Sequence, residues 1–290
     1  MYNRSVFTNV LNEKWNDSFV KLSENEFNRL KVFIEEQTGI KISPAKKILL
    51  ETRLNKRLKA LGLRSFGEYF KYVFEQKNND EIINLINHVT TNKTDFFRES
   101  SHFDYLKSTI LPKLVEKYSK ILIWSSACST GEEPYTIAFV VKDFLERHKL
   151  NAQVEILASD ISTNVLQKAV IAIYPLDVIS QIPNEYYKYL MRHKNREVNQ
   201  IRVCSEIRGM VKFKRINLLD DFSFGERFHI IFCRNVMIYF DKPTKEKILR
   251  NFKKVLVEDG YLFMGQAESL HGLNTEFEKI YNSVYRQKKI

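Results

Sequence analysis

The spacing of apolar residues changes along this chain from a helical to a mixed pattern. Up to about residue 90, apolar side chains recur every three or four positions, as at Phe27, Leu30 and Ile34, which predicts helices with one buried face. From residue 121 onwards, short apolar runs alternate with amphipathic stretches, the pattern of a mainly parallel sheet with helices between its strands. At 290 residues the chain is long enough for two cores, so we expect a small helical domain followed by an α/β domain.

The helical part carries recognisable boundary signals. Ser23 and Glu26 form a capping box at the start of the first helix, and Gly39 ends that helix. Ser43-Pro44 is a suitable start for the second helix. We expect two further helices at residues 65–74 and 80–89.

The helix that starts at Ser43-Pro44 has two distinct faces. One face is apolar and predicts contact with a core; its residues are Leu50, Leu54, Leu58 and Leu61. Beside it, Lys46, Arg53 and Arg57 fall within one narrow sector, and the interval 46–64 contains seven basic residues and one acidic residue. This basic sector is compatible both with a solvated face and with a docking stripe for an acidic helix.

The α/β part is predicted as a series of strands that end in polar residues. Strands are expected at 121–127, 154–159, 211–216, from 228, at 261–265 and as a pair within 277–287, with helices at 132–147, 162–171 and 244–256. Three of these strands deliver Asp160, Asn217 and Arg234 at their carboxyl ends. Ligands bind outside the carboxyl ends of strands in open α/β sheets, so these residues are site candidates.

One segment interrupts the alternation of strands and helices. Residues 201–205 alternate like a strand, and residues 186–192 can pair with them. We therefore expect a small antiparallel insertion at 183–210.

Three segments combine these polar residues into long motifs. They are Thr90–Glu99 (TTNKTDFFRE), Trp124–Tyr135 (WSSACSTGEEPY) and Phe228–Phe240 (FHIIFCRNVMIYF). In their order and spacing they resemble the chemotaxis receptor methyltransferases, the CheR family, over nearly the whole chain. The resemblance implies transfer of a methyl group from S-adenosylmethionine to glutamate side chains of chemoreceptor cytoplasmic helices, which gives glutamate methyl esters and S-adenosylhomocysteine.

The resemblance also implies a division of the chain. We expect an N-terminal tail at 1–21, a helical receptor-docking domain at 22–89, a linker with cofactor contacts at 90–112, and a Rossmann-like class I methyltransferase domain at 113–290. Inserted sheets of this family that bind a tethering peptide of the receptor carry glycines in their first loop. Here the loop 193–200 has none, which leaves tethering open.

The family pattern assigns cofactor contacts to nine residues of this sequence. They are Asn92, Thr94, Arg98, Glu133, Asp160, Asn217, Leu218, Arg234 and Asn235. A carboxylate at the end of a second strand can accept both ribose hydroxyls, which is the role expected of Asp160. The resemblance gives Glu133 the ammonium end of the ligand, and Asn217 and Leu218 the adenine.

The same pattern implies Arg98, Arg234 and Tyr239 as catalytic residues and Lys46, Arg53 and Arg57 as substrate-docking residues. A glutamate nucleophile, with a reference pKa of about 4.3, is already ionised at neutral pH and needs no general base. The arginines can orient its carboxylate, and Tyr239 can offer a hydroxyl or a ring face near the sulfonium.

Two positions depart from the family pattern. An acidic residue usually stands where this chain has His229, and Gly-His-Ser-Glu often stands where it has Gly265-Gln266-Ala267-Glu268. Neither departure falls on an expected cofactor contact.

The net charge of +11 admits nucleic acid, an anionic membrane surface or an acidic protein as partner. No apolar run approaches the roughly 20 residues of a membrane span, and the first 25 residues do not resemble a signal peptide. Cys128, Cys204 and Cys233 show no metal-ligand spacing. We expect a monomeric cytoplasmic enzyme without metal, membrane insertion or nucleic-acid binding.

Two alternatives stay open at this stage. A nucleic-acid methyltransferase would fit the charge, but Asn235 precedes Val236-Met237 instead of Pro-Pro and an aromatic residue, and Cys233 has no activating neighbour. A non-catalytic adaptor could bind cofactor or receptors without turnover. An enzyme is favoured because the sequence has the full set of expected site residues Arg98, Glu133, Asp160, Arg234 and Tyr239.

Overall fold

The computed structural model describes residues 19–76 and 78–288, which form two compact units. The smaller unit includes Ser43–Asn78 and the described residues up to Leu30, and the larger unit includes Lys31–Ile42 and everything from Asn79 onwards. The predicted tail at 1–21 lies mostly outside the described residues. No helix in the described part of the chain is long and apolar enough to cross a membrane.

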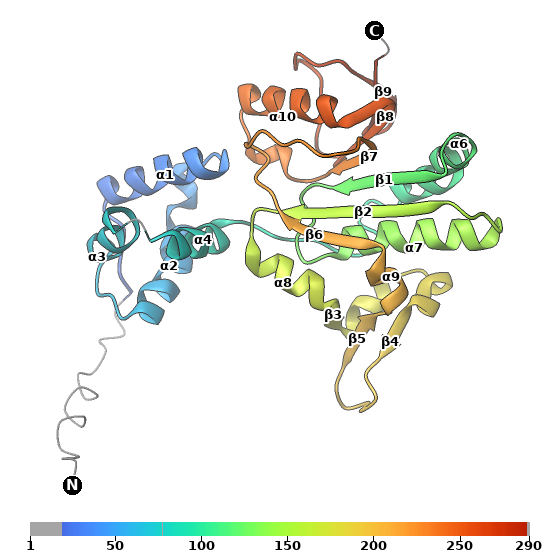
Figure 1. The fold of residues 1–290 in the computed structure, drawn as a ribbon. Helices are drawn as coiled ribbons and strands as arrows, with labels where there is room; N and C mark the ends of the chain where they lie inside the picture. The colour runs from blue at the N-terminus through green and yellow to red at the C-terminus, as the bar shows by residue number, and fades with distance from the viewer. Residues whose placement is uncertain (1–18, 77, 289–290) are drawn as a thin grey trace. The chain divides into compact units, whose positions relative to one another are not determined.

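The smaller unit is helical, as predicted (Figure 1). Its elements are the first part of α1 (Glu24–Thr38), η1 (Pro44–Lys46), α2 (Lys47–Leu61), α3 (Phe66–Phe70) and the π-helical turn η2 (Lys71–Glu75). The capping box is confirmed, because the Ser23 backbone N–H donates to Glu26 Oε2 at 2.8 Å and the Glu26 N–H donates to Ser23 Oγ at 3.3 Å.

Helix α2 buries three of the four leucines of the predicted stripe, and Leu61 is half-buried. Leu50, Leu54 and Leu58 are at most 2% exposed, and Gly62 ends the helix with a φ of 74°, a conformation that favours glycine. Arg53 and Arg57 are half-buried beside this stripe. The basic sector is therefore an edge of the buried face and not the most exposed face of the helix.

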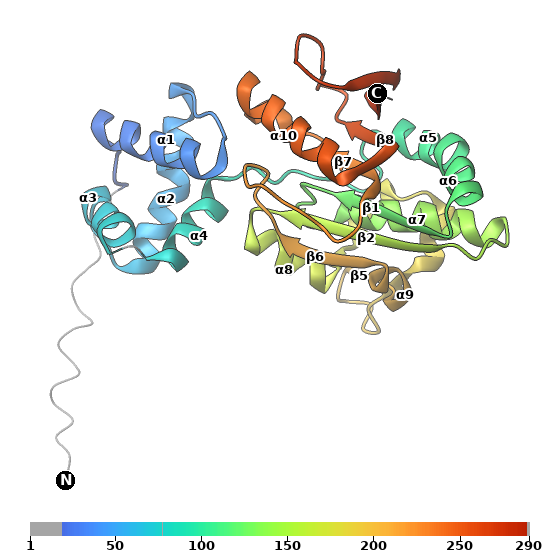
Figure 2. The same ribbon diagram turned by 45° about the horizontal axis from the view of Figure 1, so that its top comes forward.

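The larger unit is built on a seven-stranded sheet of order β6-β2-β1-β7-β8-β10-β9 (Figures 1 and 2). Its strands are β1 (Lys120–Ser125), β2 (Gln153–Asp160), β6 (Val211–Arg215), β7 (Phe228–Cys233), β8 (Leu256–Met264), β9 (Phe277–Tyr281) and β10 (Val284–Gln287). The first five strands in this order are parallel, and β10 and β9 close one edge as an antiparallel pair. This is the predicted mainly parallel α/β sheet.

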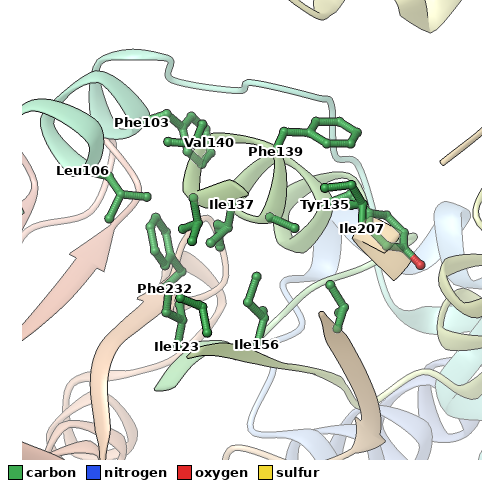
Figure 3. Close-up of a cluster of buried hydrophobic side chains, with 14 of the residues drawn as sticks. Phe103, Leu106, Ile123, Tyr135, Ile137, Phe139, Val140, Ile156, Ile207 and Phe232 are labelled. Carbon is green, nitrogen blue, oxygen red and sulfur yellow. The ribbon is translucent and has the colours of Figure 1, made fainter. Parts of the chain in front are cut away.

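Helices cover both faces of this sheet (Figure 2). They are α5 (Ser101–Tyr105), η3 (Leu106–Ile110), α6 (Leu111–Lys117), α7 (Glu132–Arg147), α8 (Thr163–Ile171), α9 (Ser205–Gly209) and α10 (Lys242–Val255). The larger unit also contains α4 (Asn79–Val89) and the short turn η6 (Met237–Tyr239). Alternate residues of β1 point to opposite faces, so Ile123 packs with α7 and Trp124 packs with α10. Figure 3 shows the first of these cores, where Ile137 and Val140 of α7 lie over the strands.

The small inserted sheet begins earlier than the predicted 183–210. It has the order β3-β5-β4, from β3 (Ile173–Pro175), β4 (Leu190–Arg192) and β5 (Gln200–Val203), with the 3₁₀ turns η4 (Leu176–Gln181) and η5 (Asn184–Tyr189) between them. The predicted pairing is confirmed only for the last three residues of 186–192. Tyr186 and Tyr189 are instead buried in η5, because the aromatic rings pack onto the α7 residue Phe139.

Strand β8 is longer than the predicted 261–265. It starts directly after α10 and is interrupted at Asp259, whose φ of 62° accompanies a register shift against β7. On β7, which pairs with β8, the His229 side chain accepts a hydrogen bond at Nδ1 from the backbone N–H of Leu122 on β1, at 3.0 Å. The departure at His229 therefore has a structural role in strand packing.

Phe232 lies at the centre of the core and offers a test of this packing. It is fully buried and stacks on Phe263 with ring centroids 4.3 Å apart. We expect Phe232→Ala to lower the free energy of unfolding by about 3–5 kcal/mol, because it leaves a cavity. Urea unfolding followed by circular dichroism would measure the loss. Val170→Ala, at a side chain 53% exposed, should change stability by less than about 0.5 kcal/mol, and an equal loss in both variants would contradict this account.

Candidate functional site

The site lies at the carboxyl edge of the sheet, where the strand order reverses between β1 and β7. The chain runs from β1 to β2 on one side and returns to β7 on the other. Ser125, the last residue of β1, is in register with Ala158 of β2 and Phe232 of β7. Such a switch point leaves a crevice between the loops that follow the strands. The polar residues after these strands therefore converge.

The loop after β1 is held by side chains from neighbouring segments. The Ser129 backbone N–H donates to Asp160 Oδ2 at 2.9 Å, and Ser129 Oγ donates to the Asn92 carbonyl at 2.8 Å. Gly131, with a φ of 100°, would place a Cβ 2.9 Å from the Tyr174 hydroxyl. A side chain does not fit there, so the loop passes close to the inserted sheet and α8 only with glycine.

The carboxylate of Asp160, at the end of β2, is a buried hydrogen-bond acceptor. Its second oxygen, Oδ1, accepts the Ser162 backbone N–H at 2.9 Å. Burial raises the pKa of this carboxyl, and the backbone N–H groups of Ser162 and Ser129 offset part of the rise. Each oxygen keeps lone-pair capacity for a further donor.

Arg234 is the buried cation of the site. Its side chain is 2% exposed; Nη1 donates to Glu133 Oε2 at 3.1 Å, and Nη2 donates to Glu99 Oε2 at 3.0 Å. Nη2 also donates to the backbone carbonyl of Arg98. The guanidinium is therefore occupied by groups of the protein, with only Nε left buried and unbonded among the described residues.

Glu133 and Glu99 respond differently to this shared cation. Burial raises the pKa of Glu133, although Arg234 and the hydroxyl of Ser125, which donates to Oε1 at 2.7 Å, act in the opposite direction. For Glu99 burial also acts upwards, but Arg234 and the hydrogen bonds that it accepts prevail and lower its pKa. Glu99 is thus the more strongly anionic partner.

The loop after β7 is fixed by Glu268. Its Oε2 accepts the backbone N–H groups of Asn235 at 2.9 Å and Gly265 at 2.6 Å, and its Oε1 accepts that of Ile238 at 3.2 Å. Asn235 has a left-handed φ of 58°, which these bonds hold in place. The loop that presents Arg234 is therefore held by a carboxylate from the neighbouring strand's end.

The motif before the sheet brings Arg98 to the site. Its Nη1 donates to the Lys93 carbonyl at 3.1 Å, and no acidic side chain pairs with it within residues 19–76 and 78–288. Asn92 contacts the loop after β1, because its carbonyl accepts the Ser129 hydroxyl. Thr94, which stands between Asn92 and Arg98 in the chain, is half-buried. Arg98 is therefore a cation with donors left for a ligand.

The other predicted residues lie further along the same edge. The amide of Asn217 is engaged, since Nδ2 donates to the Gln37 carbonyl at 2.8 Å and Oδ1 accepts the Leu219 N–H at 3.1 Å. Leu218 is 6% exposed and belongs to the core beside α10. Tyr239 is half-buried in η6, and its carbonyl accepts the Lys41 N–H at 2.9 Å.

The nearby thiol of Cys233 is unsuited to nucleophilic chemistry. The side chain is fully buried at the end of β7, and burial raises its pKa well above the ordinary range. A nucleic-acid methyltransferase that uses Cys233 as its nucleophile would therefore lack a reactive thiolate.

Comparison with family models identifies both parts of the chain. Residues 92–286 match the model described as "CheR methyltransferase, SAM binding domain", and residues 25–90 match "CheR methyltransferase, all-alpha domain". The chain belongs to the CheR methyltransferase family. The resemblance drawn from the three motifs is confirmed, and with it an S-adenosylmethionine-dependent methyltransferase of chemotaxis.

Full-length relatives agree with this assignment. The chain is 41% identical to the chemotaxis protein methyltransferase of Borreliella burgdorferi over 92% of this chain and 96% of the relative. It is 38% identical to that of Salmonella typhimurium and 36% identical to that of Escherichia coli, each over 92% of both chains.

Sequence reasoning missed two carboxylates of this CheR site. Glu99 ends the first motif, and Glu268 ends the segment Gly265–Glu268 that departs from the family pattern. Glu99 contacts Arg234, which is 135 residues away in the chain, and Glu268 contacts Asn235, which is 33 residues away. The available signal was that Glu99 follows the expected site residue Arg98 and that Glu268 keeps the acid of the family's Gly-His-Ser-Glu segment. Ser125 was also missed as the partner of Glu133, although it lies only eight residues before it inside the same motif.

Gly265 offers a test of the loop after β7. A Cβ there would lie 2.6 Å from Asn235 Nδ2 and 2.8 Å from Glu268 Oε2. We expect Gly265→Ala to destabilise the fold by about 1–3 kcal/mol through overpacking and to weaken binding of S-adenosylhomocysteine. Calorimetry and thermal unfolding would measure both. Gly225→Ala, where a Cβ meets no atom within 4 Å, should be neutral; if Gly265→Ala is equally neutral, the loop is not held as described.

His102 predicts a pH dependence of stability. It is 0% exposed, neither ring nitrogen has a hydrogen-bond partner within the described residues, and burial lowers its pKa from 6.5 to about 4. The unfolded chain binds the proton more readily, so stability is complete above pH 6.5 and is lost as the pH falls towards about 4. The full loss from this group amounts to about 3 kcal/mol.

The measurement is urea unfolding between pH 7 and pH 4. The neutral variant His102→Phe should lose less stability on acidification than the native chain. His271→Phe, at an exposed position, should retain the native slope. Identical slopes for all three proteins would show that His102 does not carry the effect.

Proposed function

We propose that this CheR protein transfers a methyl group from S-adenosylmethionine to glutamate side chains of chemoreceptor cytoplasmic helices and forms methyl esters. The observation that carries the proposal is that the segments after the strands and before the sheet supply two carboxylates, Asp160 at 8% and Glu133 at 12% exposure, and a guanidinium, Arg98, that pairs with no acidic side chain within the described residues. These groups complement a ligand with a diol, an ammonium and a carboxylate.

The residues fit the cofactor by the chemistry of their donors and acceptors. Asp160 has oxygens for the two ribose hydroxyls, Glu133 has acceptor capacity for the ammonium, and Arg98 has donors for the carboxylate. The glycine at 131 keeps the loop beside them free of a side chain. Asn92, Thr94 and Asn235 would add polar contacts, and Leu218 with Asn217 would border the adenine.

The bound cofactor supplies an electrophilic methyl group on a positively charged sulfonium. The acceptor glutamate is an anion at neutral pH, so the protein's task is to align it and to remove part of its water. Because Arg234 is occupied by Glu133, Glu99 and Arg98, we assign it to holding the site rather than to contacting the acceptor. Tyr239 and Arg98 remain the candidates for orienting the reacting groups.

The receptor would be read by the helical unit. The candidate docking residues are Lys46, directly before α2, and Arg53 and Arg57, at the edge of the buried face of α2. Their positive charges complement an acidic helix. The chemoreceptor cytoplasmic domain is accordingly the proposed partner, and the cytoplasm the proposed location.

The first test is transfer of labelled methyl from S-adenosylmethionine to a chemoreceptor cytoplasmic fragment. We expect label that mild base releases as methanol, because carboxyl methyl esters hydrolyse readily. Arg98→Ala and Asp160→Ala should each lower the rate by about 100-fold or more, since each removes a positioned charge. The exposed matched controls Arg196→Ala and Asp177→Ala should keep native rates. Base-stable label would overturn the ester chemistry, and native rates in Arg98→Ala would overturn the site.

A second test addresses receptor docking. The double charge reversal Arg53→Glu/Arg57→Glu should raise KM for the receptor fragment by about tenfold or more, because like charges then face the acidic helix. Affinity for S-adenosylhomocysteine and thermal stability should stay native, which separates docking from misfolding. Lys149→Glu, at an exposed position on the larger unit, is the control. An unchanged KM in the double variant would place docking elsewhere.

A further inference from the structure

We propose that Glu99 is a positioning residue that sets the direction of the Arg98 side chain and divides the charge of Arg234 between two carboxylates. The inference rests on the proposed function, because it assumes that Arg98 and Glu133 hold the two ends of the cofactor's amino acid. Glu99 itself need not contact cofactor or substrate.

Glu99 ties together three segments that are far apart in the chain. Its Oε2 accepts Arg234 Nη2 at 3.0 Å and the backbone N–H of Gln266 at 3.1 Å, and its Oε1 accepts Asn235 Nδ2 at 3.1 Å. The linker before the sheet is thereby joined to the ends of both β7 and β8. The carboxylate is only 13% exposed, so these bonds are made largely away from water and are correspondingly strong.

The backbone around Glu99 determines where Arg98 points. Phe97 and Glu99 have left-handed φ values of 52° and 57°, which cost free energy in residues other than glycine. Arg98 stands between them, and its carbonyl accepts Arg234 Nη2. The three bonds of the Glu99 side chain hold this unfavourable turn. The Arg98 guanidinium beside it donates to the Lys93 carbonyl at 3.1 Å and pairs with no acidic side chain within the described residues.

Glu99 also acts on Glu133 through Arg234. The guanidinium donates one nitrogen to each carboxylate, at 3.1 Å to Glu133 and 3.0 Å to Glu99. Without the negative charge of Glu99, Glu133 would be the one carboxylate left paired with Arg234 among the described residues and would take a larger share of its charge. Glu133 would then be a weaker acceptor for an ammonium group. One carboxylate thus supports both the cation and the anion of the predicted ligand site.

The test is a double-mutant cycle on the full chain with S-adenosylhomocysteine as the probe. Binding is measured by calorimetry for the native chain, Glu99→Gln, Arg98→Ala and the double variant. We expect each single variant to weaken binding about tenfold or more. The double variant should lose clearly less than the product of the two single losses, because the part of the Glu99 effect that acts through the Arg98 side chain is then already removed. Glu116→Gln, an exposed acid on α6, should bind like the native chain.

A purely structural role for Glu99 would give a different pattern. Glu99→Gln would then lower thermal stability but leave the affinity of the folded protein within about twofold of native, or the two losses would multiply in the double variant; either result overturns the inference. Because the probe needs no methyl acceptor, the cycle is independent of the receptor. Coupled losses together with absent ester formation would refute the proposed substrate and leave the role of Glu99 intact.

Discussion

The site depends on one buried guanidinium that is shared between two carboxylates. Burying Arg234 at 2% exposure is unfavourable unless its donors are paired, because removal from water costs several kcal/mol per ion. Glu133 and Glu99 supply that pairing from two segments that precede β7 in the chain by about a hundred residues or more. The consequence is that three loops cannot move independently. The same contacts that compensate a buried charge therefore define the crevice.

Around this cation the chain uses carboxylates in two different ways. Glu268 and Asp160 each accept backbone N–H groups and so fix a loop, a role for which an acceptor-only group is well suited. Asp160 and Glu133 in addition carry pKa values raised by burial, so a cationic or hydroxyl-rich ligand that approached them would relieve an unfavourable environment. Under the proposed function, scaffold and ligand site would share Asp160 as a common residue.

Much of the fold follows from periodicity alone. The leucines of α2, the alternation in β1 and the capping box at Ser23 are local signals, and the corresponding elements appear where they were expected. The errors arose where tertiary packing overrides local pattern. Tyr186 belongs to a 3₁₀ turn because its ring packs on Phe139, and β3 is too short at three residues to give a pattern.

The candidate site was predictable only as a set of residue types at strand ends. Family motifs named Arg98, Glu133 and Asp160, but no sequence pattern indicates that the Asn217 amide is taken up by Gln37, or that Arg234 is saturated by protein groups. A left-handed Glu99 is likewise invisible in a sequence, because its conformation is held by partners from β7 and the end of β8. The motif TTNKTDFFRE therefore acts as one unit: its arginine is available to a ligand because its glutamate satisfies the neighbouring cation.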